Sequence, residues 1–155
     1  MNNKTILLVE DNPDDIALTL RALKKNNIAN EVAVAHDGVE ALDYLFGSGG
    51  RAGSNLGKLT ALVLLDLKLP KIDGLEVLRR IKTDKQWHNL PIIMLTTTDD
   101  PREIEICYTL GCNCYITKPM EYERFTEMLK RLGLFLMVVQ TPKIPPQDGQ
   151  GAQRT

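Results

Sequence analysis

Five short apolar segments alternate with amphipathic stretches along this chain, and no other feature of the sequence constrains its fold more. The segments span residues 6–9, 31–35, 61–65, 92–95 and 114–117. The first, third and fourth are almost continuously apolar and rich in Ile, Leu and Val, as is typical of parallel strands that helices cover on both faces. The second and fifth are more mixed and suit the edges of a sheet.

The intervening stretches show the spacing of amphipathic helices. The first helix is predicted over residues 14–27, with Asn12 as its N-cap. Pro13 occupies the first helical position, and Asp15 is placed to complete a capping box. Four more helices are predicted over residues 37–46, 75–82, 101–110 and 121–136, the fourth ending at Gly111 as C-cap. Alternating units of this kind predict a doubly wound α/β fold with a parallel sheet.

The length of 155 residues fits one globular domain. We expect this domain over residues 4–140. Five glycines among the eleven residues 47–57 predict a mobile loop. The Pro- and Gln-containing residues 141–155 cannot build a core and predict a disordered tail. We expect no effector domain after the first, so output requires contact with another protein.

Charge and hydropathy argue against several classes of protein. The 19 Lys and Arg residues nearly balance the 20 Asp and Glu residues, which gives no indication of direct binding to nucleic acid. The longest apolar run, residues 132–139, is far shorter than the roughly 18 residues of a membrane-spanning helix. The start of the chain lacks the pattern of a signal peptide. We therefore expect a cytoplasmic protein that contacts neither nucleic acid nor membrane.

Three cysteines, Cys107, Cys112 and Cys114, lie within eight positions. An odd number argues against a disulfide framework and for a reducing compartment. The three thiols could ligate a metal. Because no His and no second cysteine pair lie nearby, we favour burial as small apolar side chains.

Acidic residues follow two of the apolar segments. Glu10 and Asp11 come directly after the first segment, and Asp66 follows the third. Open parallel sheets bind ligands beyond the carboxyl ends of their strands, so these three carboxylates should meet in one crevice. Repulsion raises their pKa values unless a divalent cation that prefers oxygen neutralises them, and Mg²⁺ is the natural choice. The alternative is that these acids are unrelated turn and cap residues.

Two other segment ends add hydrogen-bond donors to the same edge. Thr96 closes the fourth segment and Lys118 follows the fifth, so a hydroxyl and an ammonium could both donate to an oxyanion. The three acids, Lys118 and one Mg²⁺ together are neutral before a phosphoryl group arrives. This composition suits phosphoryl transfer to the carboxylate of Asp66, which would form an acyl phosphate.

The residues at these positions resemble the receiver domains of two-component response regulators. The matching segments are residues 6–12, residues 65–70 with Asp73 and Gly74, residues 95–96 and residues 115–119. The resemblance implies a flavodoxin-like receiver fold, with a doubly wound five-stranded parallel sheet in the order 2-1-3-4-5 and five helices. It also implies a protein that is not a turnover enzyme but promotes its own aspartyl phosphorylation and autodephosphorylation.

By this resemblance, Asp66 accepts a phosphoryl group from the phosphohistidine of a sensor histidine kinase. Asp11, Asp66 and the backbone carbonyl of Lys68 would bind Mg²⁺. Glu10, which replaces the Asp often found there, would act through a metal-bound water. The Lys68 side chain at the entrance could alter the rate of dephosphorylation.

The resemblance also implies a conformational switch. Thr96 would bond a phosphoryl oxygen and draw its loop inward, Tyr115 would move inward behind it, and Lys118 would pair with the phosphate. Tyr115 could instead be only an edge-strand aromatic. The bond between Lys118 and Pro119 would be the cis peptide usual for this family, a state that proline makes accessible.

The glycine-rich insertion and the apolar run near the end of the fifth predicted helix resemble free-standing regulators that are paired with bacterial phytochromes. The donor would then be a sensor histidine kinase of the phytochrome type, and the output partner an unknown downstream protein. Residues 134–139 would be either packed core or the surface of a homodimer.

Two other functions remain as alternatives. A phosphatase of the aspartyl-phosphate type usually has a second Asp two residues after the nucleophile, where this chain has Lys68. A flavodoxin-like flavin binder needs a phosphate-cradling loop after the first strand, where Glu10 and Asp11 would repel the phosphate. Neither His36 nor His88 falls at a predicted strand end near Asp66, so we do not expect either to act as a catalytic base.

Overall fold

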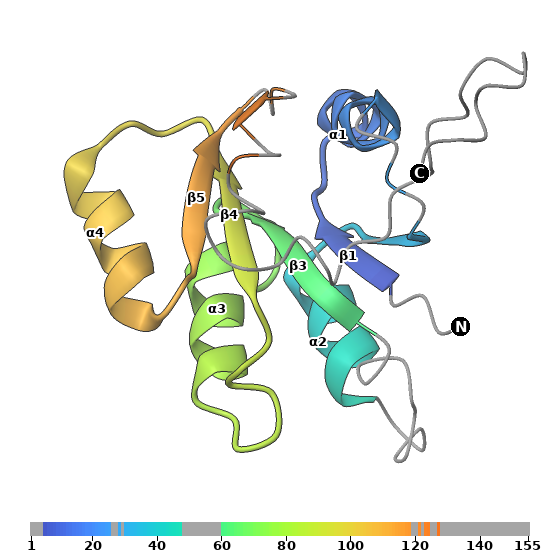
Figure 1. Ribbon diagram of the computed structural model, residues 1–155. Helices are drawn as coiled ribbons and strands as arrows, with labels where there is room; N and C mark the ends of the chain where they lie inside the picture. Colours follow the sequence, from blue (N-terminus) through green and yellow to red (C-terminus); the bar gives the residue numbers. More distant parts are fainter. Residues whose placement is uncertain are drawn as a thin grey trace, which may run out of the picture.

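The apolar segments form one parallel sheet, with strand order β2-β1-β3-β4-β5 as predicted (Figure 1). The computed structural model describes residues 5–25, 28, 30–47, 60–118, 121, 123, 124 and 127. The strands are β1 (Thr5–Val9), β2 (Val32–Ala35), β3 (Thr60–Asp66), β4 (Ile92–Thr96) and β5 (Cys114–Thr117). The helices are α1 (Pro13–Lys25), α2 (Gly38–Phe46), α3 (Gly74–Lys82) and α4 (Pro101–Leu110).

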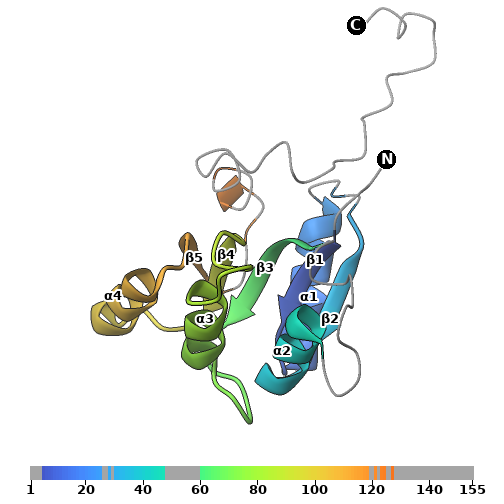
Figure 2. The ribbon, with the colours of Figure 1, turned by 90° about the horizontal axis from the view of Figure 1, so that it is seen from below.

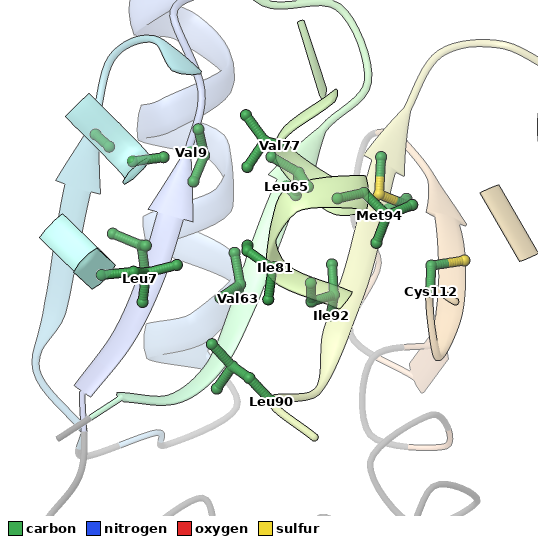
Figure 3. Packing of buried hydrophobic residues seen from close by; sticks show 14 of the residues in the cluster. Leu7, Val9, Val63, Leu65, Val77, Ile81, Leu90, Ile92, Met94 and Cys112 are labelled. Atoms are coloured by element: carbon green, nitrogen blue, oxygen red, sulfur yellow. The ribbon is translucent and has the colours of Figure 1, made fainter. Parts of the chain in front are cut away.

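Helices cover the sheet on both faces, with α1 on one side and α2 and α3 on the other (Figure 2). Alternate residues of each central strand enter different cores: Leu7 packs with the cluster under α2 and α3, whereas Leu8 packs with the cluster under α1. In the first cluster, Val77 and Ile81 of α3 lie over the sheet (Figure 3). The central strands need apolar side chains on both faces, which explains their unbroken apolar runs.

The start of α1 confirms its predicted N-cap but not its capping box. The side-chain oxygen of Asn12 accepts hydrogen bonds from the backbone N–H groups of Asp14, at 2.8 Å, and Asp15, at 3.1 Å. The N–H of Asn12, however, donates to the carboxylate of Glu10 at 3.1 Å, and not to Asp15. The Asp15 carboxylate pairs instead with the ammonium of Lys118, since attraction to a cation is stronger than a bond to a neutral amide.

The other helix ends follow ordinary capping rules. Asp37 and Asp73 cap α2 and α3, so the predicted start of the second helix at Asp37 is its cap residue. Gly111 ends α4 with a φ of 109°, in the left-handed region that favours glycine, which confirms the predicted C-cap. The described part of α1 runs to Lys25, and the last two residues of the predicted helix, 26 and 27, lie outside the described ranges.

Several sequence predictions fall on residues outside the described ranges. These are most of the glycine-rich loop 47–57, the tail 141–155, the apolar run 134–139 and the Lys118–Pro119 bond. Within the predicted fifth helix, residues 123, 124 and 127 have helical conformation, and most of the rest of that helix also lies outside the described ranges. The described part of the chain therefore has four complete helices where five were predicted.

The loop between β3 and α3 is held by close backbone contacts. The N–H of Gly74 donates to the carbonyl of Leu67 at 2.9 Å, and a Cβ added at Gly74 would lie 2.2 Å from the carbonyl oxygen of Asp66. Lys71, with a φ of 67°, places its ammonium 3.3 Å from the buried carboxylate of Asp37. These contacts fix the backbone that follows the end of β3.

The three cysteines are free and buried, as predicted. Burial, with a smaller contribution from the charges of neighbouring thiols, raises the pKa of Cys112 to about 12. Among the described residues, the one group placed to hold a metal ion is made of carboxylates and not of cysteines. The cysteines therefore act as small apolar side chains. No described helix combines the length and apolarity needed to cross a membrane.

Candidate functional site

Three carboxylates meet at the carboxyl ends of β1 and β3. Glu10 and Asp11 follow β1 and Asp66 ends β3, and these strands pair in register. One carboxylate oxygen from each of the three lies within 4.8 Å of the others. Glu10 and Asp66 are buried, whereas Asp11 is exposed to solvent. The predicted convergence of the three acids is confirmed.

Lys118 supplies the positive charge at the centre of this group. Its ammonium lies 2.6 Å from Glu10, 3.1 Å from Asp15 and 3.3 Å from Asp66. Its side chain is only 11% exposed, so solvent screens these contacts weakly. Its backbone N–H donates to the carbonyl of Thr96 at 2.8 Å, which links the end of β5 to the end of β4.

Asp15 is a site residue that the sequence reasoning assigned to the helix cap alone. It lies in the first turn of α1 and, by pairing with Lys118, adds a fourth carboxylate to the site. Four carboxylates and one ammonium give the site a formal charge of −3, one unit more negative than the predicted set. Its proximity to Asn12 and Pro13 in sequence offered no signal of this contact, because Lys118 is 103 residues away.

Burial and charge act against each other at Asp66. Burial raises the pKa of Asp66 to about 6; the positive charge of Lys118 opposes this rise and the negative charge of Glu10 adds to it. Burial also tends to lower the pKa of Lys118, but its hydrogen bond to Glu10 and its attraction to Asp66 outweigh burial, so the pKa of Lys118 is raised. The ammonium therefore stays charged, while the carboxylates keep excess negative charge.

This donor set fits a divalent cation. Oxygen ligands from three carboxylates within reach of one ion are what hard cations such as Mg²⁺ prefer. The raised pKa of Asp66, which reflects burial and the charge of Glu10, indicates negative charge that Lys118 alone does not neutralise. Lys68 is exposed and lines the same cavity as Asp11.

Thr96 and Tyr115 lie on the neighbouring strands. Thr96 ends β4 and is buried, and its hydroxyl accepts a hydrogen bond from the N–H of Thr98 at 3.0 Å. Its own proton therefore remains available to a further acceptor. Tyr115 is partly buried and packs edge-to-face on Tyr108 of α4, with ring centroids 6.0 Å apart. In this structure the Tyr115 ring thus contacts α4.

The two histidines lie outside this group, as expected. The ring of His36 is 3.2 Å from the carboxylate of Glu40, in an exposed pair at the start of α2. His88 is exposed in the turn between α3 and β4. Neither is a candidate base for chemistry at Asp66.

A doubly wound sheet with a buried aspartate, further carboxylates, a threonine and a lysine at its carboxyl edge defines a phosphoacceptor signalling domain. The family model described as response regulator receiver domain matches residues 6–130. The chain belongs to this family, and is therefore a two-component signalling protein and not a classical enzyme.

Relatives place the chain near the regulators of phytochromes, as the resemblance implied. It is 35% identical over 138 residues to response regulator Rcp1 of Synechocystis, covering 89% of this chain and 92% of Rcp1. The solved bacteriophytochrome response regulator AtBRR is 48% identical, with a TM-score of 0.76, covering 85% of this chain and 94% of AtBRR.

Two further solved structures bear on the chemistry. Rcp1 has been solved in a Mn²⁺-bound form, with 34% identity and a TM-score of 0.68, covering 90% of this chain and 99% of Rcp1. The cyanobacterial phytochrome response regulator RcpA has been solved phosphorylated, with 39% identity and a TM-score of 0.70, covering 86% of this chain and 93% of RcpA. Divalent metal and phosphorylation thus both occur among similar proteins.

Proposed function

We propose that Asp66 is the phosphoacceptor of this response regulator and that its donor is a phosphohistidine of a sensor histidine kinase. The contact that carries this proposal is the ion pair of 3.3 Å between Asp66 and Lys118, at the end of the central strand β3. It leaves a carboxylate that can attack phosphorus beside a cation that can neutralise the incoming oxygens.

In the proposed step, a carboxylate oxygen of Asp66 forms a bond to phosphorus while the bond from phosphorus to the histidine nitrogen breaks. The electron pair of that bond stays on the imidazole of the kinase. Lys118 balances the charge of the phosphoryl oxygens and thereby loosens its hold on the surrounding acids. Catalysis of this kind is mostly positioning and charge neutralisation.

The metal ligands in this proposal are Asp11, Asp66 and the backbone carbonyl of Lys68, with Glu10 acting through a water. Bound Mg²⁺ would supply positive charge that orients and neutralises the phosphoryl oxygens. Glu10 is held by Lys118 at 2.6 Å and by the N–H of Asn12 at 3.1 Å, which favours an indirect role for its carboxylate.

Thr96, Tyr115 and Lys118 would convert phosphorylation into a change of shape. The free proton of the Thr96 hydroxyl would go to a phosphoryl oxygen, and the inward movement of its loop would open space that the Tyr115 ring fills. Tyr115 would then leave its contact with Tyr108 of α4. A cis bond between Lys118 and Pro119 would fix the loop that carries the ammonium.

The same site would limit the lifetime of its own acyl phosphate. Water attacking phosphorus would release inorganic phosphate and regenerate the Asp66 carboxylate, so the protein promotes both phosphorylation and autodephosphorylation. Lys68, exposed at the entrance, would influence the access of that water.

Incubation with acetyl phosphate and Mg²⁺, followed by intact mass measurement under mild conditions, tests the acceptor. We expect one labile phosphoryl adduct in the wild-type protein and none in Asp66→Asn. Asp14→Asn, which changes an exposed acid of α1, is the matched control and should retain the adduct. An adduct that persists in Asp66→Asn would overturn the proposal.

Similarity to AtBRR and Rcp1 supports a histidine kinase of the phytochrome type as the donor. Its phosphorylated form should transfer to Asp66 faster than kinases of other types do, in a comparison of purified labelled kinases. Equal rates with all kinases would contradict this assignment.

Output would pass to an unidentified downstream protein, with residues 134–139 forming a homodimer surface. Light scattering with and without acetyl phosphate tests the dimer, and a monomer in both conditions would reject it. We place the protein in the cytoplasm, because three free cysteines suit a reducing compartment. We also propose no direct contact with nucleic acid or membrane, since the 19 basic residues nearly balance the 20 acidic ones.

A further inference from the structure

A cavity of about 420 Å³ opens beside the proposed phosphoacceptor site, and the proposed function gives it no role. It lies between the β3–α3 loop, the start of α3 and the first turn of α4. Leu67, Leu69 and Leu75 are among its apolar lining residues. Its size and its apolar lining suit a side chain with an aliphatic stem.

The charged lining of the cavity is mainly negative. Asp11, Asp73 and Glu103 contribute three carboxylates, against the single ammonium of Lys68. If Asp11 binds a metal ion, the two carboxylates of Asp73 and Glu103 still outnumber the ammonium of Lys68, whose side chain is exposed. A ligand that fits this lining is therefore cationic.

Glu103 differs from the other acids around the cavity. Its Oε1 atom is buried and receives no hydrogen bond from any described residue. In contrast, Asp73 accepts a hydrogen bond from the N–H of Glu76 at 3.0 Å. A carboxylate oxygen removed from water without a donor leaves the negative charge of Glu103 poorly stabilised, so a cation bound beside Glu103 in the cavity is favoured.

We propose that this cavity binds an arginine side chain of a protein partner, with the guanidinium on Glu103 and apolar atoms of the partner on the leucines. A guanidinium suits Glu103 better than an ammonium does, because it is less strongly hydrated and holds its donors in a fixed plane. The inference rests on the proposed function in one respect: because Asp11 and Lys68 line the cavity, the partner would lie across the entrance to Asp66.

Titration of the full isotope-labelled chain with the capped dipeptide acetyl-Leu-Arg-amide tests this inference by amide NMR. Acetyl-Leu-citrulline-amide is the matched probe, since citrulline keeps the shape of arginine without its charge. We expect saturable shifts at Leu67, Leu69 and Glu103 with the arginine peptide alone. Glu103→Gln should weaken its binding about tenfold, as expected for a charge-assisted hydrogen bond.

Glu105→Gln, on the exposed face of the same helix, is the control variant and should bind the arginine peptide as the wild type does. Equal binding of both peptides would show that the cavity binds apolar atoms and does not recognise the charge of arginine. If Glu103→Gln bound the arginine peptide as tightly as the wild type, Glu103 would not be the residue that holds the guanidinium. Either result overturns the inference, as does the absence of shifts around the cavity. Failure of the wild-type chain to form an adduct at Asp66 would overturn the proposed function while leaving the titration interpretable.

Discussion

Asp66 is kept in an environment that disfavours its own charge. Burial raises its pKa from 3.8 to about 6, with Lys118 opposing and Glu10 increasing the rise. Between these two pH values, the unfolded chain has released a proton that the folded chain still holds. The free energy of unfolding therefore falls as the pH rises through this window and stays reduced above it.

Asp66→Asn should accordingly stabilise the metal-free protein. Near neutral pH, we expect the free energy of unfolding to rise by about 1–2 kcal/mol, less than the full pKa shift implies because the buried site can relax around the charge. This gain in stability should vanish below about pH 4, where Asp66 is protonated in both the folded and the unfolded wild-type chain. Urea unfolding in the presence of a chelator measures the free energy of unfolding of both proteins. Addition of Mg²⁺ should reduce the difference in stability between the variant and the wild type. A loss of stability in Asp66→Asn at neutral pH would show that the Lys118 pair dominates.

Asp15 should increase the affinity of the site for a divalent cation without being a ligand. Its carboxylate, 3.1 Å from Lys118, offsets the positive charge that would otherwise repel the ion. We expect Asp15→Asn to weaken Mn²⁺ or Mg²⁺ binding about threefold, measured by calorimetry. Asp14→Asn removes an equal charge from the exposed face of α1 and should have less effect. Equal losses in the two variants would show that only the overall charge matters.

At the scale of elements, the start of α3 sets the position of the loop after β3. Gly74 leaves no room for a side chain, because an added Cβ would lie 2.2 Å from the carbonyl oxygen of Asp66 and 2.6 Å from that of Leu67. Both atoms belong to backbone that cannot rotate away. Any larger residue must displace either the helix or the loop.

Gly74→Ala should therefore lower both stability and reactivity. We expect a loss of about 3 kcal/mol in the free energy of unfolding, as for other severe overpacking, with slower adduct formation from acetyl phosphate in the fraction that remains folded. Arg80→Ala, on the exposed face of α3, is the control and should change stability by less than about 1 kcal/mol. Wild-type reactivity in Gly74→Ala would indicate that the loop tolerates displacement.

The helices and strands can be predicted from local sequence, whereas the candidate site can be predicted only in part. Apolar runs and capping residues predicted the strands and the four complete helices to within about two residues, because those signals act between near neighbours. The convergence of Glu10, Asp11 and Asp66 was also predictable, since parallel strands end at one edge. The pairing of Asp15 with Lys118 was not, because it joins side chains 103 residues apart. Nor did any local pattern indicate the unsatisfied oxygen of Glu103.

At the scale of the whole molecule, the sheet is most deeply buried and most fully paired at its centre. All seven residues of β3 are buried, and β3 pairs with a strand on each side. The edge strands β2 and β5 contain partly exposed positions and each pairs on one side within the described sheet. Asp66 thus ends a fully buried central strand, while Lys118 follows an edge strand.

Native-state hydrogen exchange should reproduce this order. Amides of Val63, Leu64 and Leu65 should exchange only through global unfolding, whereas those of Tyr115 in β5 and Ala33 in β2 should exchange through smaller openings at least tenfold faster. The dependence of each rate on low concentrations of urea distinguishes the two routes. Equal protection across the sheet would mean that β5 does not move independently of the core.

The backbone hydrogen bond from Lys118 to Thr96 has a consequence for the evolution of such proteins. Because both partners are main-chain atoms, replacing either side chain leaves the bond in place, and only proline at position 118 would remove the donor. Mutation can therefore alter the chemistry at either position without uncoupling the two loops. If the two loops move on phosphorylation as proposed, this bond couples their movement through the backbone, and selection can vary the side chains while the linkage persists.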